Sequence, residues 1–334
     1  MRVAILGAGS IGCFVGGAWQ VAGVSVHFIG RKRLANEVAE HGLHLTDSEG
    51  WDVRLSPAAV DYAIDPSGLI DADLIALAVK SGATEEAARQ ILSHARPGTP
   101  VLSLQNGISN IGMLSAILAD RHPVIRGMVP YNVAHLGGGH FHKGVAGQLM
   151  AEDVPLMRDL AMRIGKSPAG FILSNDMLGI AWGKLLINLN NAVNALSGRP
   201  LMAQLSERDY RRVVAASMRE GLGLLAKASI KPAQVGPVAP ALLPTVIGSP
   251  NWIFNNLFLK LQRIDAHARS SMADDLAQGR RTEIDYLNGE LIALADRLDA
   301  EAPVNRRIAA LIHEAEGGGR HDWSPAELRM AILL

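Results

Sequence analysis

The sequence predicts an α/β protein in which a doubly wound parallel sheet, residues 1–175, is followed by an all-α domain, residues 176–334. Short apolar segments alternate with helical patterns up to about Ser174, as in a parallel sheet with crossover helices. From Asn175 onward only helical periodicity remains. The length of 334 residues, of which 49% are hydrophobic, is enough for two domains with their own cores.

The composition narrows the choice of partners and compartment. Lys plus Arg and Asp plus Glu each number 32, so no net field favours nucleic acid or an anionic membrane surface. The single cysteine, Cys13, excludes an internal disulfide framework and a cysteine-rich zinc site, and it suits a reducing compartment. Residues 3–30 carry no Lys, Arg, Asp or Glu, but their seven glycines argue against a membrane span. We therefore expect a cytoplasmic protein that binds neither nucleic acid nor membrane.

The N-terminus has the pattern of a dinucleotide-binding turn. A strand is expected at Arg2–Leu6, a helix up to about Ala22 and a second strand at Val24–Ile29. Between the first strand and the helix lies a GxGxxG sequence, in the context that a Rossmann-type domain requires. Its glycines let the backbone approach a pyrophosphate, whose charge the helix N-terminus favours. The expected cofactor-binding residues of this turn are Gly7, Ala8, Gly9, Ser10, Ile11 and Gly12.

The end of the second strand indicates which cofactor is bound. An NAD site expects an acidic residue there for the ribose 2′-hydroxyl, whereas this chain has Gly30-Arg31-Lys32-Arg33 and no carboxylate before Glu37. A glycine followed by Arg31 leaves room for a 2′-phosphate and can bind it bidentately. We therefore expect NADP(H). The alternative is that Arg31–Arg33 only form the solvated start of a helix.

The parallel pattern continues to the end of the first domain. A hairpin is expected from Gly42–Thr46 and Trp51–Leu55. The further elements are a helix at Thr84–His94 and strands at Asp73–Val79, Pro100–Leu104 and Val124–Val129. Lys80 and Asn106 directly follow two of these strands, at the edge where doubly wound sheets bind ligands, so we expect both to line the cofactor site. Each residue also has an ordinary alternative explanation: Lys80 as a surface lysine, and Asn106 as part of an Asn-Gly turn.

Three histidines lie around a glycine-rich stretch and raise the question of a metal site. His135, His140 and His142 precede an expected strand, Val145–Met150. His140 and His142 can share one face of a strand, but no third ligand with supporting spacing is visible. We favour a peripheral hairpin and expect no metal.

The second half predicts a helical domain. Helices are expected at 176–197, 201–228, 252–278, 282–298 and 303–315, with a proline-punctuated segment at 232–250. A last helix should begin at Ser324-Pro325-Ala326-Glu327, which combines a capping box with proline at the first helical position.

The stretch from Trp182 to Gly198 carries polar groups inside an apolar helix. Lys184 shares it with asparagines at 188, 190, 191 and 194. On a regular helix Asn188 and Asn191 fall within about 40° of Lys184, so one buried face is polar. Since a buried polar group without a partner costs about 1–3 kcal/mol, this face must meet protein, water or a ligand.

Residues 270–289 place a serine and a glutamate close to a helix break. Gly279 is expected to end the helix that contains Ser271, and Thr282 and Asp285 resemble a capping box for the next one. Ser271 and Glu283 can therefore border one cleft. Glu283 also has an ordinary alternative, an acid stabilised by the helix dipole.

Taken together, these motifs resemble the ketopantoate reductases (2-dehydropantoate 2-reductases) over nearly the whole chain. The resemblance rests on GAGSIG at 7–12, VKS at 79–81, Gln105-Asn106-Gly107, WGKLLIN at 182–188 and, most specifically, SSMADDLAQGRRTEIDYLNG at 270–289. It implies Lys184 as the proton donor, Glu283 beside it, Asn188 and Ser271 on the substrate, and Lys80 and Asn106 on the cofactor side.

The chain differs from the family pattern at one position of the helix that carries Lys184. The family often has a second asparagine eight residues after the lysine, where this chain has Ala192. Asn194 corresponds to the family's second asparagine if two residues are inserted before it, whereas Asn191 fits the polar face of a regular helix. We take Asn194 as the first candidate for this substrate contact.

The reaction implied by the resemblance is NADPH-dependent reduction of ketopantoate to pantoate, in pantothenate biosynthesis. The alternatives are another 2-oxo acid and a non-catalytic NADP(H) sensor. The apolar C-terminus is compatible with internal packing or with a homodimer.

Overall fold

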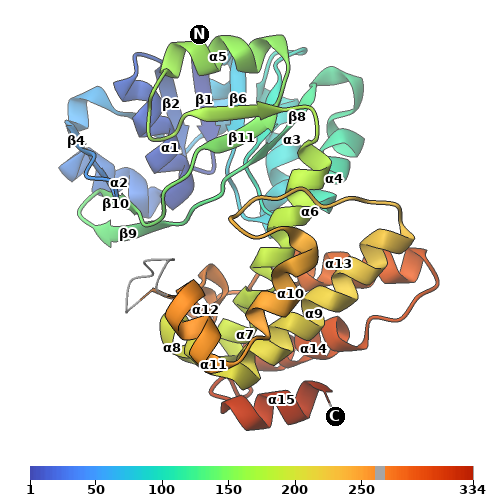
Figure 1. Cartoon of the computed structure of the whole chain (residues 1–334). Helices are drawn as coiled ribbons and strands as arrows, with labels where there is room; N and C mark the ends of the chain where they lie inside the picture. The colour runs from blue at the N-terminus through green and yellow to red at the C-terminus, as the bar shows by residue number, and fades with distance from the viewer. Residues whose placement is uncertain (260–267, 334) are drawn as a thin grey trace. The chain divides into compact units, whose positions relative to one another are not determined.

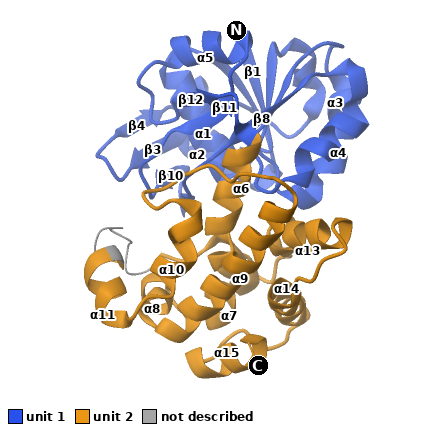
Figure 2. Cartoon of the chain, turned by 45° about the vertical axis from the view of Figure 1, so that its right-hand side comes forward, with its two compact units in different colours: residues 1–177 blue, residues 178–334 orange. Residues whose placement is uncertain are grey.

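The computed structural model describes residues 1–259 and 268–333. Its contacts divide the chain into two compact units, Met1–Met177 (unit 1) and Leu178–Leu334 (unit 2), which Figure 2 colours separately. The division falls close to the boundary expected at residue 175. Among the described residues, no helix is both long and apolar enough to cross a membrane.

Unit 1 contains an eight-stranded sheet of order β12-β11-β8-β7-β6-β1-β2-β5. Neighbouring strands are parallel except β11 and β8, which are antiparallel. The strands are β1 (Arg2–Leu6), β2 (Ser25–Ile29), β5 (Asp61–Ala63), β6 (Leu74–Leu77), β7 (Val101–Ser103), β8 (Val124–Met128), β11 (Leu149–Glu152) and β12 (Phe171–Ser174). The strand order reverses between β1 and β6, which is the switch point at which doubly wound sheets open a crevice for ligands.

Helices cover both faces of this sheet because alternate strand residues point to opposite sides. Val3 and Ile5 join the core that contains Phe14 of α1, whereas Ala4 and Leu6 join the core that contains Ile91 of α3. The helices of unit 1 are α1 (Ser10–Val21), α2 (Lys32–His41), α3 (Thr84–His94), α4 (Ser109–Leu118) and α5 (Pro155–Ile164). Figure 1 shows α3 and α5 on this sheet domain, and the doubly wound fold predicted from the sequence is confirmed.

A smaller four-stranded sheet, β4-β3-β10-β9, packs beside α1. It joins the predicted hairpin, β3 (Leu43–Asp47) and β4 (Asp52–Leu55), to the histidine hairpin, β9 (Val133–Gly137) and β10 (His140–Lys143). The strand expected at Val145–Met150 was placed too early. Residues 145–148 are not in a strand, and Gly147 has φ +145°, which a β-strand residue does not adopt.

The described residues of unit 2 form helices joined by loops, and none of them lies in a β-strand. Its longest helix, α9, packs against α10, α13, α14 and α15, while α7 packs against α12 and α14. The helices are α6 (Met177–Asn188), α7 (Asn190–Ser197), α8 (Leu201–Ser206), α9 (Arg208–Lys227), α10 (Leu243–Ile247), α11 (Asn251–Ile253), the π-helix Phe254–Leu259, α12 (Ser271–Ala277), α13 (Asn288–Arg297), α14 (Pro303–Glu316) and α15 (Pro325–Leu333). The all-α prediction for this half is confirmed.

Several predicted helices are interrupted. The helix 176–197 breaks at Leu189, and 201–228 breaks at Glu207, whose backbone is extended. The prediction of one continuous helix over 252–278 was wrong, because residues 268–270 are not helical. Residues 260–267 of this predicted helix lie outside the described part of the chain. The final helix begins as predicted, since Glu327 N–H donates to Ser324 Oγ and Ser324 N–H donates to the Glu327 carboxylate.

Candidate active site

The glycine turn of unit 1 is shaped for close approach to its backbone. Gly7 has φ +93°, and a Cβ there would lie 2.5 Å from the Val79 nitrogen. A Cβ on Gly12 would lie 2.8 Å from the Gly7 oxygen. The N-cap residue Gly9 offers no side chain to the first turn of α1, which also lacks an acidic residue. These features fit a bound pyrophosphate, because the turn is compact and the positive end of the helix dipole has no side-chain carboxylate of its own.

The region after β2 only partly matches the expectation for a 2′-phosphate. Gly30 leaves no empty space: a Cβ there would lie 2.1 Å from the Tyr62 hydroxyl, which donates to the Ala8 carbonyl at 2.7 Å. Tyr62 is therefore a neighbour of the glycine turn that the sequence did not reveal, and its hydroxyl accounts for a glycine at position 30. Arg31 is the exposed N-cap residue of α2.

Glu37 is the first carboxylate after β2, and it has a structural role. It accepts hydrogen bonds from His135 Nε2 at 2.6 Å and from Gly139 N–H at 2.8 Å, and it pairs with Arg33 at 3.3 Å. These bonds lower its pKa despite the opposing effect of burial. Glu37 thus fastens α2 to the β9–β10 hairpin.

Lys80 and Asn106 follow β6 and β7, two neighbouring strands, at the same edge of the sheet as the glycine turn after β1. Lys80 is exposed and Asn106 is half-buried. Asn110 N–H groups donate to the Asn106 carbonyl at 2.5 Å and to Ser81 Oγ at 2.9 Å. The two loops that carry Lys80 and Asn106 are therefore tied together.

Two further buried side chains, Gln105 and Thr84, complete this polar network, and the sequence did not predict their contacts. Gln105 donates to the Val79 carbonyl at 3.2 Å and to Thr84 Oγ1 at 2.7 Å. Thr84 Oγ1 also lies 2.7 Å from the Ser81 carbonyl, to which it donates. Because the buried groups satisfy one another, they hold the loops in one arrangement.

The three histidines of the side sheet serve structure. His140 Nε2 and His142 Nδ1 each lie 2.8 Å from Thr46 Oγ1, and His140 stacks on His44 with ring centroids 4.0 Å apart. Within residues 1–259 and 268–333, no group of three or more His, Cys, Asp or Glu side chains could hold a metal ion.

Lys184 is a half-buried lysine on α6 of unit 2. Burial lowers its pKa from 10.5 to about 8, and the carboxylate of Glu283 opposes this effect by raising the pKa. Glu283 is half-buried at the start of the 3₁₀ turn Ile284–Tyr286. An ammonium group with this pKa can give up its proton near neutral pH, as a general acid must.

The chain segment around Ala233 explains the glycine that precedes Lys184. A Cβ on Gly183 would lie 2.0 Å from the Ala233 oxygen, and Ala233 N–H donates to the Gly179 carbonyl at 2.8 Å. The proline-punctuated segment 232–250 therefore begins directly against α6, beside Lys184. The sequence did not predict this contact.

Asn194, which was predicted to contact the substrate, is held by hydrogen bonds within the protein. Its side chain is completely buried. The amide nitrogen donates to the Arg199 carbonyl at 3.0 Å, and the amide oxygen accepts from Ser270 N–H at 2.9 Å. Asn188, the last residue of α6, and Asn191, in the first turn of α7, are half-buried instead.

The two serines at the start of α12 have different environments. Ser270 is the buried N-cap residue: its hydroxyl accepts from Ala273 N–H at 3.2 Å and donates to the Asn191 carbonyl at 3.2 Å. Ser271 is exposed at the first position of the helix. Gly279, with φ +62°, lies just beyond the end of α12 as predicted.

The capping box predicted for the next helix is wrong. Thr282 Oγ1 accepts from Ile284 N–H at 3.2 Å, while Asp285 pairs with His313 at 3.0 Å. The α13 helix begins only at Asn288.

Comparison with known proteins identifies the family. The profile of the "Ketopantoate reductase PanE/ApbA" family matches residues 3–155, and that of its C-terminal domain matches residues 176–316. The chain belongs to the ketopantoate reductase family. It is 28% identical to the 2-dehydropantoate 2-reductase of Halobacterium salinarum over 96% of this chain and 100% of that protein.

Solved structures agree with this assignment. A PanE/ApbA family ketopantoate reductase from Ralstonia eutropha JMP134 is 29% identical, with a TM-score of 0.81 over 95% of this chain and 99% of that chain. A D-mandelate dehydrogenase solved with NADH and anilino(oxo)acetate shares the fold at 21% identity, with a TM-score of 0.75 over 95% and 99% of the two chains. The protein is accordingly an oxidoreductase of a family that uses NAD(P)H.

Proposed function

We propose that this protein reduces 2-dehydropantoate to pantoate with NADPH, a step of pantothenate biosynthesis, and that Lys184 donates the proton. The observation that carries the proposal is the electrostatic environment of Lys184, whose pKa of about 8 reflects burial opposed by Glu283. Such a lysine is protonated at neutral pH and still acidic enough to release its proton.

The chemistry requires a cation at the substrate ketone. A bound reduced nicotinamide would supply a hydride to the ketone carbon, and negative charge would then develop on the ketone oxygen. The Lys184 ammonium stabilises this charge by a charge-assisted hydrogen bond and then transfers its proton to the oxygen. Glu283 keeps Lys184 protonated and oriented.

The substrate contacts that we propose are Asn188 and Ser271, with Asn191 as the second asparagine in place of Asn194. Asn188 and Asn191 are half-buried and Ser271 is exposed, so their side chains can reach a ligand. Amide and hydroxyl groups suit the carboxylate and hydroxyl of a 2-oxo acid, which need hydrogen-bond donors in fixed positions.

The preference for NADPH over NADH rests on Arg31. It is exposed at the end of β2, and the first following carboxylate, Glu37, is already bound to His135 and Gly139. A guanidinium favours a 2′-phosphate at this place, whereas an acidic side chain would favour the free 2′-hydroxyl. The dinucleotide is held by the turn Gly7–Gly12, with Lys80 and Asn106 beyond the neighbouring strands.

Oxidation of NADPH, followed by its absorbance with 2-dehydropantoate as substrate, tests the proposal. We expect turnover by the wild-type chain and a loss of about 10²–10⁴-fold in kcat for Lys184→Ala, with little change in NADPH affinity. An unchanged kcat in this variant would refute the role of Lys184. Tight NADPH binding without turnover of 2-dehydropantoate would refute the substrate assignment.

A second candidate function is the reduction of another 2-oxo acid by the same residues. The observation in its favour is the segment that starts at Ala233 and packs against α6 beside Lys184, because extra chain near the proton donor can change which side chain of an oxo acid is accepted. A panel of 2-oxo acids, compared by kcat/KM under identical conditions, distinguishes the two functions.

We further propose that the protein acts in the cytoplasm as a homodimer. Large apolar side chains are exposed on unit 2, among them Trp252 at 72% and Leu257 at 54% of their accessible surface. Exposed apolar groups of this size favour association. Light scattering after size-exclusion chromatography measures the mass directly, and a monomer at micromolar concentration would exclude the dimer.

A further inference from the structure

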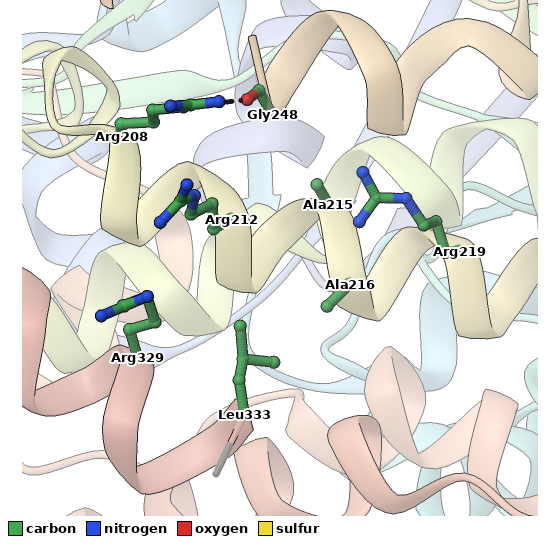
Figure 3. Close-up of a pocket in the computed structure, with 8 residues that line it drawn as sticks. All are labelled: Arg208, Arg212, Ala215, Ala216, Arg219, Gly248, Arg329 and Leu333. Atoms are coloured by element: carbon green, nitrogen blue, oxygen red, sulfur yellow. Dashed lines mark hydrogen bonds between the residues drawn. The ribbon is translucent and has the colours of Figure 1, made fainter. Parts of the chain in front are cut away.

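Four arginines line a cavity in unit 2 that the proposed reaction does not use. The cavity has a volume of about 400 Å³ and is lined by Arg208, Arg212, Ala215, Ala216, Arg219, Gly248, Arg329 and Leu333. Figure 3 shows the first three arginines along α9, with Arg329 and Leu333 projecting from α15. The volume lies within the range of small-molecule sites.

The sequence spacing explains why three of the arginines share one face of α9. On α9, positions 208, 212 and 219 are four and seven residues apart, so at about 100° per residue all three lie within about 40° of one another. Ala215 and Ala216 lie on the turn between Arg212 and Arg219, and their short side chains leave the hollow open. Like charges four residues apart on a helix, here Arg208 and Arg212, are unfavourable by a few tenths of a kcal/mol, so this pair costs stability when no anion is present.

The protein itself compensates only part of this positive charge. Asp209 is the carboxylate that pairs with these arginines, at 3.3 Å from Arg212 and 3.5 Å from Arg329. Arg329 Nε is buried and makes no hydrogen bond within the described residues, because its 3.5 Å separation from the Asp209 carboxylate is too long for one. Arg208 donates through Nε to the Gly248 carbonyl at 3.3 Å, and it has no ionic partner among residues 1–259 and 268–333. Arg219 is exposed and makes no hydrogen bond or ion pair within the described part of the chain.

A neighbouring arginine holds the wall of the cavity in place. Arg211, on the adjacent face of α9, is completely buried and donates to the carbonyls of Ile247 and Ser249 at 2.8 Å each. These bonds fix the segment that carries Gly248. Burial lowers the pKa of Arg211 to about 10, and the charge of Arg208 acts in the same direction. The cavity is thus a fixed part of unit 2, surrounded by excess positive charge.

We propose that this cavity is a binding site for a small organic molecule that carries a diphosphate group. Guanidinium groups bind phosphate oxygens bidentately, and four of them along one cavity suit two linked phosphates better than a single carboxylate. The alanines and Leu333 provide an apolar surface for the organic part of the ligand. A bound diphosphate would offset the repulsion along α9 and link α9 to α15.

Calorimetric titration of the full chain with inorganic pyrophosphate, at constant ionic strength, tests the site. We expect Arg219→Gln and Arg329→Gln each to weaken binding by about tenfold or more, the effect of losing a hydrogen bond between charged groups. The matched control is Arg297→Gln on α13, an exposed arginine that also has no ionic partner in the described residues. It should bind as the wild type does.

The same variants distinguish binding in this cavity from binding at the glycine turn of unit 1, which can attract the same anion. Pyrophosphate bound there would be unaffected by changes at Arg219 and Arg329. Equal affinity in all four proteins, an equal loss in Arg297→Gln, or no binding by the wild type would each overturn the proposal. Since Arg219 is exposed, Arg219→Gln should unfold at the wild-type temperature without ligand, and a weakened affinity in this variant then reports the site itself.

Discussion

Replacement of Glu283 by glutamine should move the pH dependence of the reaction rather than abolish the reaction. The carboxylate of Glu283 raises the pKa of Lys184, which burial has lowered to about 8. The amide that replaces this carboxylate keeps the shape of the side chain but carries no charge. The pKa of Lys184 should therefore fall further, and the protonated form that donates to the ketone oxygen should be lost at lower pH.

The size of the effect follows from the protonated fraction of Lys184. An opposite charge nearby changes a pKa by about one unit or more. With a pKa of about 8, about three quarters of Lys184 is protonated at pH 7.5; with a pKa of about 7, about one quarter is. The rate at pH 7.5 should then fall about threefold and the rate at pH 9 about ninefold, while at pH 5.5 both proteins are almost fully protonated and should react equally.

The assay is kcat/KM for NADPH oxidation from pH 5.5 to pH 9.5, because this ratio reports the pKa values of the free enzyme. Asp285→Asn is the matched control, since Asp285 is exposed in the same 3₁₀ turn and pairs with His313. It should leave the profile unchanged. If Glu283→Gln lowers the rate by the same factor at every pH, Glu283 positions a group without tuning Lys184, and the electrostatic reasoning is refuted.

Three other variants test neighbouring claims. Arg31→Ala should weaken NADPH binding by about 1.5–3 kcal/mol, the scale of a hydrogen bond to a charged group, and leave NADH binding unchanged; equal losses in fluorescence titrations with both cofactors would make Arg31 structural. Asn194→Ala should lower the free energy of unfolding by about 1–3 kcal/mol, because it leaves the Ser270 N–H and the Arg199 carbonyl without their buried partner. Asn191→Ala should instead raise KM for the oxo acid with little effect in urea denaturation, and the reverse result would restore Asn194 to the substrate.

The parts of the fold that the sequence predicted well are those with strong local signals. The strand Arg2–Leu6 and the helix Thr84–His94 have the predicted ends, because an apolar run and an amphipathic pattern there are bounded by glycine, threonine or proline. Short elements without such signals were missed. The edge strand Asp61–Ala63 exists because it pairs with β2, and no local pattern announces that pairing.

The candidate site was predictable where a motif fixes the backbone and less predictable where tertiary contacts decide. The glycine turn and the lysine on α6 follow from local sequence. In contrast, Asn191 and Asn194 look alike in the sequence, and only the break at Leu189 and the partners of Asn194 separate their roles. Tyr62 could not be found, because it reaches the glycine turn from a part of the chain that is distant in sequence. Gln105 belongs to the motif Gln105-Asn106-Gly107, but its contacts with Val79 and Thr84 depend on the tertiary structure and could not be predicted.

The environment that makes Lys184 an acid should also cost the protein stability. At pH values below about 8 the lysine is charged in both the folded and the unfolded chain, and its burial disfavours the folded one. Between about pH 8 and the ordinary lysine pKa of 10.5 the folded chain releases the proton while the unfolded chain retains it, so the free energy of unfolding should rise with pH. The gain is at most about 3 kcal/mol, less what solvent screening removes. Denaturant titrations of wild type and Lys184→Met at pH 7.5 and pH 10 measure it: Lys184→Met should lack the rise, and a rise of equal size in both proteins would mean that other groups cause it.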